Sequence, residues 1–413
     1  MSRVKSLLIV CLAALAIYQT GLLWFVNITN RSFFIYFTQL FDRGVPDGYT
    51  DIIRPRRVIY GNGDGFFTLR YGERSEMANS AITEILARGV FNGIVPAETA
   101  LTAALQAPVI LHEYAFPLRA EIFATAFSQR STILSDRGID AITRVAVLNE
   151  GVIFMDETHA WAFNLPVGTF ELDTVYIDRG LFFVSDEQTP WVFIPRTEAG
   201  YRHHPIRVVN PYANRSGEVQ LNSVNAQVSH FFDNPAVRNP RMEENVITIS
   251  TINTVVRYLP GNVLEFNCFR PIRRREAPNF MTDFSAAVAF INNDVNVQND
   301  FLLARYEVRG RTHVFWFSYV IRDEDARGFP LIAPQGGWGS AAAPLFYPIE
   351  VVVDHGRVSR YRKVAFIFEL DATQHFALSQ DAFNPQGAGA SYIFGYPAIH
   401  GAGLVLYRVG GGE

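Results

Sequence analysis

The sequence predicts an α+β protein in which one N-terminal transmembrane helix is followed by an elongated extracytoplasmic region of about three α+β units. Residues 6–30 contain no charged side chain, and a run of ~20 apolar residues can span the hydrocarbon core as a helix. Beyond residue 57, helical and strand-like patterns fall into separate blocks, which is typical of the α+β class with antiparallel sheets. The chain is 49% hydrophobic, so the region outside the membrane can bury real cores.

The charges beside the apolar run set its orientation. Arg3 and Lys5 stand immediately before it, and basic residues stay on the cytoplasmic side of a membrane. We therefore expect a single-pass cell-membrane protein with its bulk outside. A cleaved signal peptide is the alternative, but its apolar region spans only ~7–15 residues. The small-residue site Ala14-Leu15-Ala16 would end such a region, yet apolar residues continue well beyond it. The uncleaved anchor is our expectation.

Composition shifts along the chain divide it further. We expect a cytoplasmic N-terminus at residues 1–5, a transmembrane helix at 6–27, an N-terminal α+β domain at 28–195, a central helix-plus-meander domain at 196–280 and a C-terminal helix-plus-meander domain at 281–413.

The N-terminal domain should open with a hairpin. Strand-like residues 57–60 and 66–71 flank Gly61–Gly65, where Gly and Asn supply the positive φ of a tight turn. A phosphate-binding loop is disfavoured, because the spacing is G-x-G-x-G rather than G-x-G-x-x-G and strands flank the loop on both sides. The following elements are expected as helices at Ser75–Phe91, Pro96–Ala107 and Leu118–Phe127, and as strands at Val109–Tyr114, Ala141–Leu148, Val152–Asp156 and Ala160–Leu165.

The next two domains should each consist of one helix followed by an antiparallel meander. Residues 190–211, rich in Pro, Gly, Arg and His, mark the boundary before them, and we expect His203 and His204 in a solvent-exposed loop there. Thr282 is the expected N-cap of the last long helix. The helices are expected at Ser223–Phe232, Thr282–Asn293 and His375–Phe383, and the strands at 246–252, 254–259, 263–269, 302–308, 313–321, 349–353 and 359–368. Arg270 and Arg273–Arg275 fit a solvated linker.

Charge, cysteines and motifs argue against catalysis and cofactors. The formal net charge of −4 gives no electrostatic footprint for nucleic acid. Cys11 lies in the expected span and Cys268 outside it, so the two cannot pair within one chain. The motifs G-x-S-x-G, H-E-x-x-H and C-x-x-C are absent. The acidic run at 323–325 fits a hairpin end without a metal. We expect no enzyme activity, no cofactor and no metal.

Several short strings occur in a fixed order between residues 223 and 370. They are Phe231–Arg238 before the first meander, Thr251–Leu259 within it, Ala287–Asn292 at the end of a helix, and Val314–Val320, Gly328–Leu331, Ile349–Val351 and Val358–Tyr361 in the last meander. This series resembles the YycH family, and its last part also resembles the paralogue YycI. YycH proteins are membrane-anchored accessory proteins of a two-component system that controls cell-wall metabolism in Gram-positive bacteria. The resemblance is thin over the first domain.

The resemblance implies a non-enzymatic regulator that binds a sensor histidine kinase of the YycG (WalK) type, with a YycI-like paralogue as a second partner. A span without charges can contact a partner span through small surfaces and a few hydrogen bonds. The candidate contact residues are Ala13, Ala16, Gln19, Thr20 and Gly21. Three alternatives remain. The span only anchors the chain, the outer region is an envelope protein that binds a wall or lipid component without a kinase partner, or it is an envelope hydrolase whose site carries no recognised motif.

Overall fold

The computed structural model describes most of the chain after residue 51. The described residues are 52–73, 75–127, 132–165, 172, 177–178, 180–186, 193–197, 202–214, 217–270, 279–322, 328–334, 337–338, 345–374, 376–377, 391–398 and 405–409. The expected N-terminus at 1–5, the expected transmembrane helix at 6–27 and the acidic run at 323–325 lie outside them. Among the helices that are described, none has the length and apolar character needed to cross a membrane.

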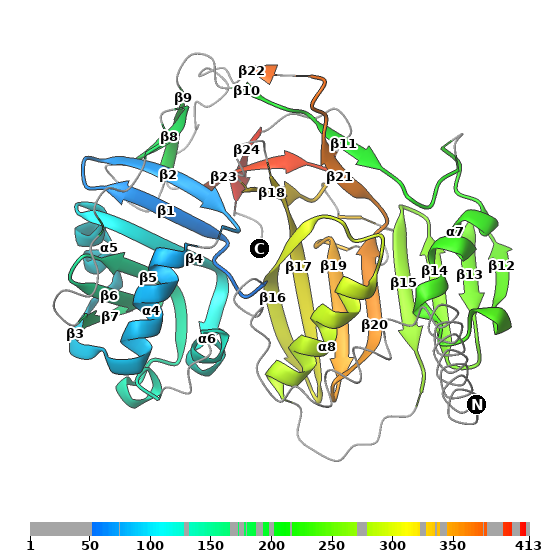
Figure 1. The fold of residues 1–413 in the computed structure, drawn as a ribbon, viewed down its shortest axis with the longest axis horizontal. Helices are drawn as coiled ribbons and strands as arrows, with labels where there is room; N and C mark the ends of the chain where they lie inside the picture. The colour runs from blue at the N-terminus through cyan, green and yellow to red at the C-terminus, as the bar shows by residue number, and fades with distance from the viewer. Residues whose placement is uncertain are drawn as a thin grey trace, which may run out of the picture.

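The α+β class is confirmed. Two large, mainly antiparallel sheets lie beside each other, with helices packed on their faces (Figure 1). The first sheet has nine strands in the order β3-β7-β6-β5-β4-β1-β2-β8-β9. These strands are β1 (Arg57–Asn62), β2 (Phe66–Tyr71), β3 (Val90–Pro96), β4 (Pro108–Arg119), β5 (Ala141–Leu148), β6 (Gly151–Met155), β7 (His159–Asn164), β8 (Leu181–Ser185) and β9 (Phe193–Thr197).

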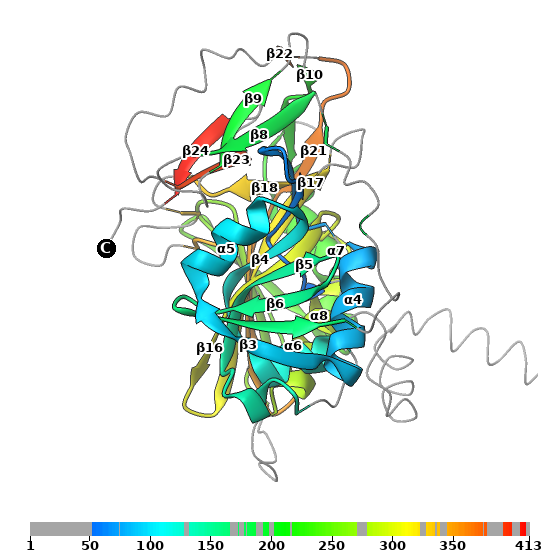
Figure 2. The same ribbon diagram turned by 90° about the vertical axis from the view of Figure 1, so that its left-hand side faces the viewer.

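Helices cover both faces of this first sheet. Helix α4 (Glu76–Arg88) contacts β5 and β6, whereas α5 (Ala97–Leu105) contacts β3, β4, β5 and β7. Figure 2 shows the two helices on opposite sides of the sheet. The side chain of Ser75 caps α4 by accepting a hydrogen bond from the Ala78 amide. Because both faces are covered, Val145–Val147 of β5 are buried without alternation.

The structure corrects the expected ends of several helices and strands in this region. The helix expected to reach Phe91 ends at Arg88, and the residues after Gly89 form the edge strand β3. Strand β3 pairs with β7 around a bulge between Phe91 and Gly93, so sheet pairing overrides the local helical periodicity. Strand β4 continues to Arg119, which delays the short helix α6 to Ala120–Ala126. Strands β8 and β9 were not expected from the sequence.

The second sheet has eleven strands and crosses the boundary expected at residue 280. Its order is β12-β13-β14-β15-β20-β19-β17-β18-β23-β24, and β16 pairs with β17. The central and C-terminal units therefore share one sheet. Its strands are β12 (Asn239–Glu243), β13 (Val246–Ser250), β14 (Thr254–Leu259), β15 (Val263–Cys268), β16 (Asp300–Arg309), β17 (Thr312–Arg322), β18 (Gly328–Ile332), β19 (Ile349–Asp354), β20 (Arg357–Val364), β23 (Ser391–Pro397) and β24 (Val405–Val409).

Helices lie on one face of this second sheet. Helix α8 (Phe280–Asn293) contacts β17, β19 and β20, while α7 (Leu221–Gln227) contacts β12 and β13. Both helices lie in front of the sheet in Figure 1. Asn279, not the expected Thr282, caps α8, because its side-chain oxygen accepts a hydrogen bond from the Thr282 amide at 3.1 Å.

The segment expected as a solvent-exposed histidine loop is in fact buried. His203 lies in β10 (Arg202–His203), which pairs with β22 (Phe376–Ala377), and β11 (Ile206–Val209) pairs with β21 (Ile367–Leu370). His203 and His204 are 6% and 5% exposed, and burial lowers the pKa of His203 to about 4, with a smaller effect from His204. Phe376 and Ala377 form a strand where a helix was expected, and 378–383 lie outside the described residues.

The two sheets meet tightly where β2 ends. The carbonyl of Gly72 accepts a hydrogen bond from Arg322 at 3.2 Å, and Asp300 pairs with both Arg54 (2.6 Å) and Arg322 (2.7 Å). A Cβ at Gly328 would lie 2.1 Å from the Tyr71 carbonyl oxygen, so only glycine permits this approach. This contact fixes the position of β4 relative to β16.

Candidate functional site

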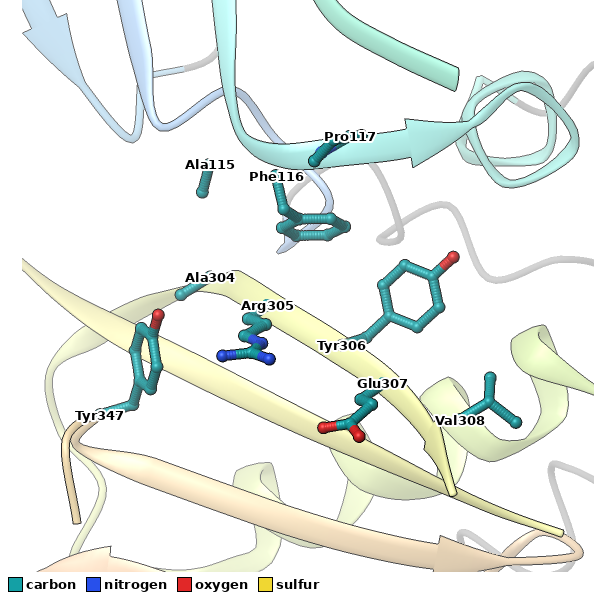
Figure 3. A pocket seen from close by; sticks show the side chains of 9 residues that line it. All are labelled: Ala115, Phe116, Pro117, Ala304, Arg305, Tyr306, Glu307, Val308 and Tyr347. Carbon is teal, nitrogen blue, oxygen red and sulfur yellow. The ribbon is translucent and has the colours of Figure 1, made fainter. Parts of the chain in front are cut away.

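A groove lies between β4 of the first sheet and β16 of the second (Figure 3). Its volume is about 480 Å³, within the range of ligand sites in proteins. It is lined by Ala115, Phe116, Pro117, Ala304, Arg305, Tyr306, Glu307, Val308 and Tyr347. Five of these, residues 304–308, are consecutive in β16. Because alternate side chains of a strand point to opposite faces, the groove follows the backbone edge of β16 rather than one face of the sheet.

One wall of the groove is an irregular part of β4. Pairing with β5 stops at Glu113 opposite Arg144 and resumes at Leu118 opposite Ile142. Pairing with β1 also stops at Glu113. Residues 114–117 therefore bulge away from both neighbouring strands and present Phe116 to the groove, where its ring lies 5.4 Å from that of Tyr306. Such bulges re-aim side chains beside functional surfaces.

The other wall is the hairpin of β16 and β17. Gly310, with φ of +64°, and Arg311 form its two-residue turn, and glycine is favoured at the first position of such a turn. Strand β16 pairs with β17 alone, so its outer edge is unpaired within the described part of the chain. Arg305, Val308 and Arg309 are exposed there.

Beside this edge, arginine side chains enclose an indole ring. The guanidinium carbons of Arg305 and Arg309 lie 5.2 Å and 5.5 Å from the centre of the Trp316 ring, which gives two cation–π contacts. The Trp316 indole donates a hydrogen bond to Glu350 at 3.0 Å, and Arg360 donates to the same carboxylate at 2.7 Å. The Tyr347 ring is 6.4 Å from Trp316. The side chains are thus held in place by one another.

Trp316 belongs to a polar row that crosses the face opposite α8. In strand register the row consists of Arg305, Trp316, Glu350, Arg362, Glu265, Arg257, Thr248 and Arg241. Opposite charges alternate in its centre, with Glu265 3.8 Å from Arg362 and 3.6 Å from Arg257. Such cross-strand pairs stabilise the sheet, and at the centre of the row Trp316, Glu350 and Arg362 are buried. At the groove end Glu307 is the acidic neighbour of Arg305: the pKa of its carboxyl is lowered by the hydrogen bond from Arg309 and also by the charge of Arg305.

A second group of ionisable side chains is sealed in the core. Asp294 pairs with Lys363 at 2.7 Å and accepts a hydrogen bond from the Tyr361 hydroxyl at 3.0 Å, and His230 Nε2 lies 3.4 Å away. Burial raises the pKa of the Asp294 carboxyl, but Lys363 and His230 outweigh it and hold that pKa well below its usual range. Asp294, Lys363 and Tyr361 are at most 1% exposed. No substrate can reach them, so the group fastens the end of α8 to β20.

A buried Asp–His pair also holds elements of the fold together. Asp283 on α8 and His313 on β17 are joined by a 2.6 Å hydrogen bond, and Asp283 also accepts one from the Gly356 amide. Phe280 packs edge-on against His313. The carboxylate therefore ties α8 to the β19–β20 turn. Within the described residues there is no group of three or more His, Cys, Asp or Glu side chains arranged to hold a metal ion.

The residues singled out from the sequence and the residues of the groove do not coincide. The span candidates Ala13, Ala16, Gln19, Thr20 and Gly21 lie outside the described residues. Cys268 ends β15, where its sulfur accepts a hydrogen bond from Arg357 at 3.1 Å. The groove was missed, although the charged–apolar alternation of Arg305–Arg309 gave a signal for a solvated edge strand. Phe116 gave none, because the bulge that presents it depends on pairing with β5.

Comparison of the chain with family models, with curated proteins and with solved structures finds no match in any of the three.

Proposed function

We propose that this protein is a non-enzymatic regulator, anchored in the cell membrane by a helix at residues 6–27, that binds a sensor histidine kinase of the YycG (WalK) type controlling cell-wall metabolism. A YycI-like paralogue is the second proposed partner. The observation that carries the proposal is the groove along β16, which Tyr306, Tyr347 and Arg305 line, with Trp316 buried beneath the Arg305 side chain. Tyr, Trp and Arg are the side chains that dominate protein–protein binding energy. The sequence resemblance to YycH supports the choice of partner.

Regulation would act on a two-state kinase. A sensor kinase has at least two arrangements of its helix bundle, and a partner that packs better against one of them shifts the population toward it. The proposed chain offers two surfaces for this: the groove outside the membrane, and the span with Gln19 and Thr20 as polar contacts. Contacts at both surfaces would shift the same equilibrium between the two states of the kinase.

The test is photo-crosslinking in cells from two positions, Gln19 in the span and Tyr347 in the groove. We expect a histidine kinase among the captured proteins at both positions. An exposed residue remote from the groove, Met242 on β12, is the control position. Replacing residues 6–27 by an unrelated span should reduce signalling. Capture of no kinase from either position, or unchanged signalling with both the foreign span and a Tyr306→Ala groove variant, refutes the proposal.

A second candidate function follows from the volume of the groove. About 480 Å³ between Phe116, Tyr306 and Tyr347 can accommodate a small molecule, which fits an envelope protein that binds a wall or lipid component without a kinase. Thermal shift measurements with muropeptides and lipid headgroups separate the two functions. A shift that Tyr306→Ala abolishes, together with no kinase capture, favours ligand binding.

A further inference from the structure

We infer that β16 binds an extended segment of a partner protein as an added antiparallel or parallel strand, and that this segment alternates acidic with apolar side chains. The inference deepens the proposed function by naming the chemistry of the partner, and it rests on that function only for the partner's identity. Strand addition uses backbone hydrogen bonds for affinity and side-chain pockets for specificity. The groove supplies both.

The first argument is the backbone of the hairpin. In the two-residue turn at Gly310-Arg311, the flanking residues Arg309 and Thr312 are the first and last residues of the turn, and these exchange backbone hydrogen bonds. Bonded and non-bonded pairs then alternate along an antiparallel ladder. It follows that the amide and carbonyl groups of Val308 and Tyr306 point outward, along the groove that residues 304–308 line.

The second argument is the chemistry on the two sides of this edge. Arg305, Glu307 and Arg309 lie on the sheet face that carries Trp316, whereas Tyr306 lies on the face of α8, against Phe280. A strand added at the edge would alternate its side chains in the same way. Those on the Trp316 side would meet arginines, and those on the other side would meet the Tyr306 and Phe116 rings.

The third argument is the sign of the local charge. Glu307 is 3.0 Å from Arg309 and also interacts electrostatically with Arg305. One glutamate therefore stands against three exposed arginines, Arg305, Arg309 and Arg311, on this stretch of the chain. The groove edge is therefore locally positive in a chain whose formal net charge is −4. Charge complementarity selects acidic side chains on the partner and raises the rate of encounter.

The experiment uses the full chain in detergent and two fluorescently labelled peptides of about eight residues, the length of a long strand. One alternates valine with glutamate and the other valine with lysine. We expect the glutamate peptide to bind and the lysine peptide to bind far more weakly, as measured by fluorescence anisotropy. Hydrogen exchange should show protection of the Tyr306 and Val308 amides when the glutamate peptide is present. Equal binding of the two peptides, or no protection of these amides, overturns the inference.

Matched variants test the charge argument and the backbone argument separately. Arg305→Glu should weaken the glutamate peptide about tenfold and favour the lysine peptide, whereas Arg241→Glu, an exposed arginine on the edge strand β12, should change neither. Val308→Pro removes an outward amide and should abolish binding, while Val308→Ala should keep it. Equal binding by these last two variants refutes strand addition. If Val308→Pro fails to fold, a peptide with N-methylated valines replaces it and should not bind.

The outcomes are separable from those of the kinase test. Peptide binding with the expected charge preference, but without kinase capture, keeps the strand-addition site and refutes only the proposed function. Kinase capture that survives Arg305→Glu and Val308→Pro keeps the proposed function and refutes the site.

Discussion

His112 is a buried histidine whose removal should change how stability depends on pH. It lies in the centre of β4, in register with Val58 of β1 and Val145 of β5, and its side chain has no exposed surface. Neither ring nitrogen has a hydrogen-bond partner among the described residues. Burial lowers the pKa of His112 from 6.5 to about 3.

The sign and size of the effect follow from this shift. Below pH 6.5 the unfolded chain takes up a proton at His112, while the folded protein does not until about pH 3. The contribution of His112 to the free energy of unfolding is therefore fully present above pH 6.5, and it is lost as the pH falls toward 3. Each pKa unit corresponds to ~1.4 kcal/mol, so the free energy of unfolding should fall by about 2 kcal/mol between pH 7.5 and pH 5 from this residue alone.

The assay is urea unfolding of the wild type and of His112→Leu at both pH values. Leucine matches the volume and has no polar atom to bury, so the variant should be more stable by ~1–3 kcal/mol at pH 7.5. Its loss of stability on going to pH 5 should be about 2 kcal/mol smaller than that of the wild type. His203, whose pKa is also lowered by burial, titrates in both proteins and cancels in the difference.

A neighbouring apolar residue provides the control. Val145 lies in register with His112 and is buried, so Val145→Ala should lower the free energy of unfolding by the same amount at pH 7.5 and pH 5. The reasoning fails if His112→Leu loses as much stability as the wild type between pH 7.5 and pH 5. It also fails if the variant is destabilised at both pH values, because the ring would then be hydrogen-bonded in the folded protein.

Two further predictions concern the core and the contact between the sheets. Lys363→Met leaves the carboxylate of Asp294 buried without the lysine that pairs with it. The variant should lose about 3–5 kcal/mol of unfolding free energy in urea titrations at pH 7. Adding Asp294→Asn should recover part of that loss, and no recovery would contradict an ion-pair role. Gly328→Ala places a methyl group against the Tyr71 carbonyl and should lower the free energy of unfolding by about 1–3 kcal/mol, measured by calorimetry. In Gly93→Ala the added carbon meets open space, so the loss should be smaller. Equal losses would contradict the close approach of β18 to β2.

Local sequence patterns were sufficient to predict the helices and turns that depend on nearby residues. The hairpin at Gly61–Gly65 is confirmed as the β1–β2 connection, because turn chemistry acts over a few residues. The apolar spacing of residues 75–88 likewise predicted α4, and Ser75 caps it. Strand β3 was mistaken for the end of that helix, since only its pairing with β7 makes Val90–Pro96 extended.

The sequence by itself determined the α+β class, most helices and strands, and the expectation of a membrane span before residue 28. Periodicity and turn residues are local properties, so they can be recognised from neighbouring residues in the sequence. Tertiary structure alone decided that the last two expected units share one sheet, that His203 and His204 are buried, and that Phe116 faces Tyr306 across a groove. These outcomes depend on which strands pair over long separations, and the side chains that meet there are far apart in the chain.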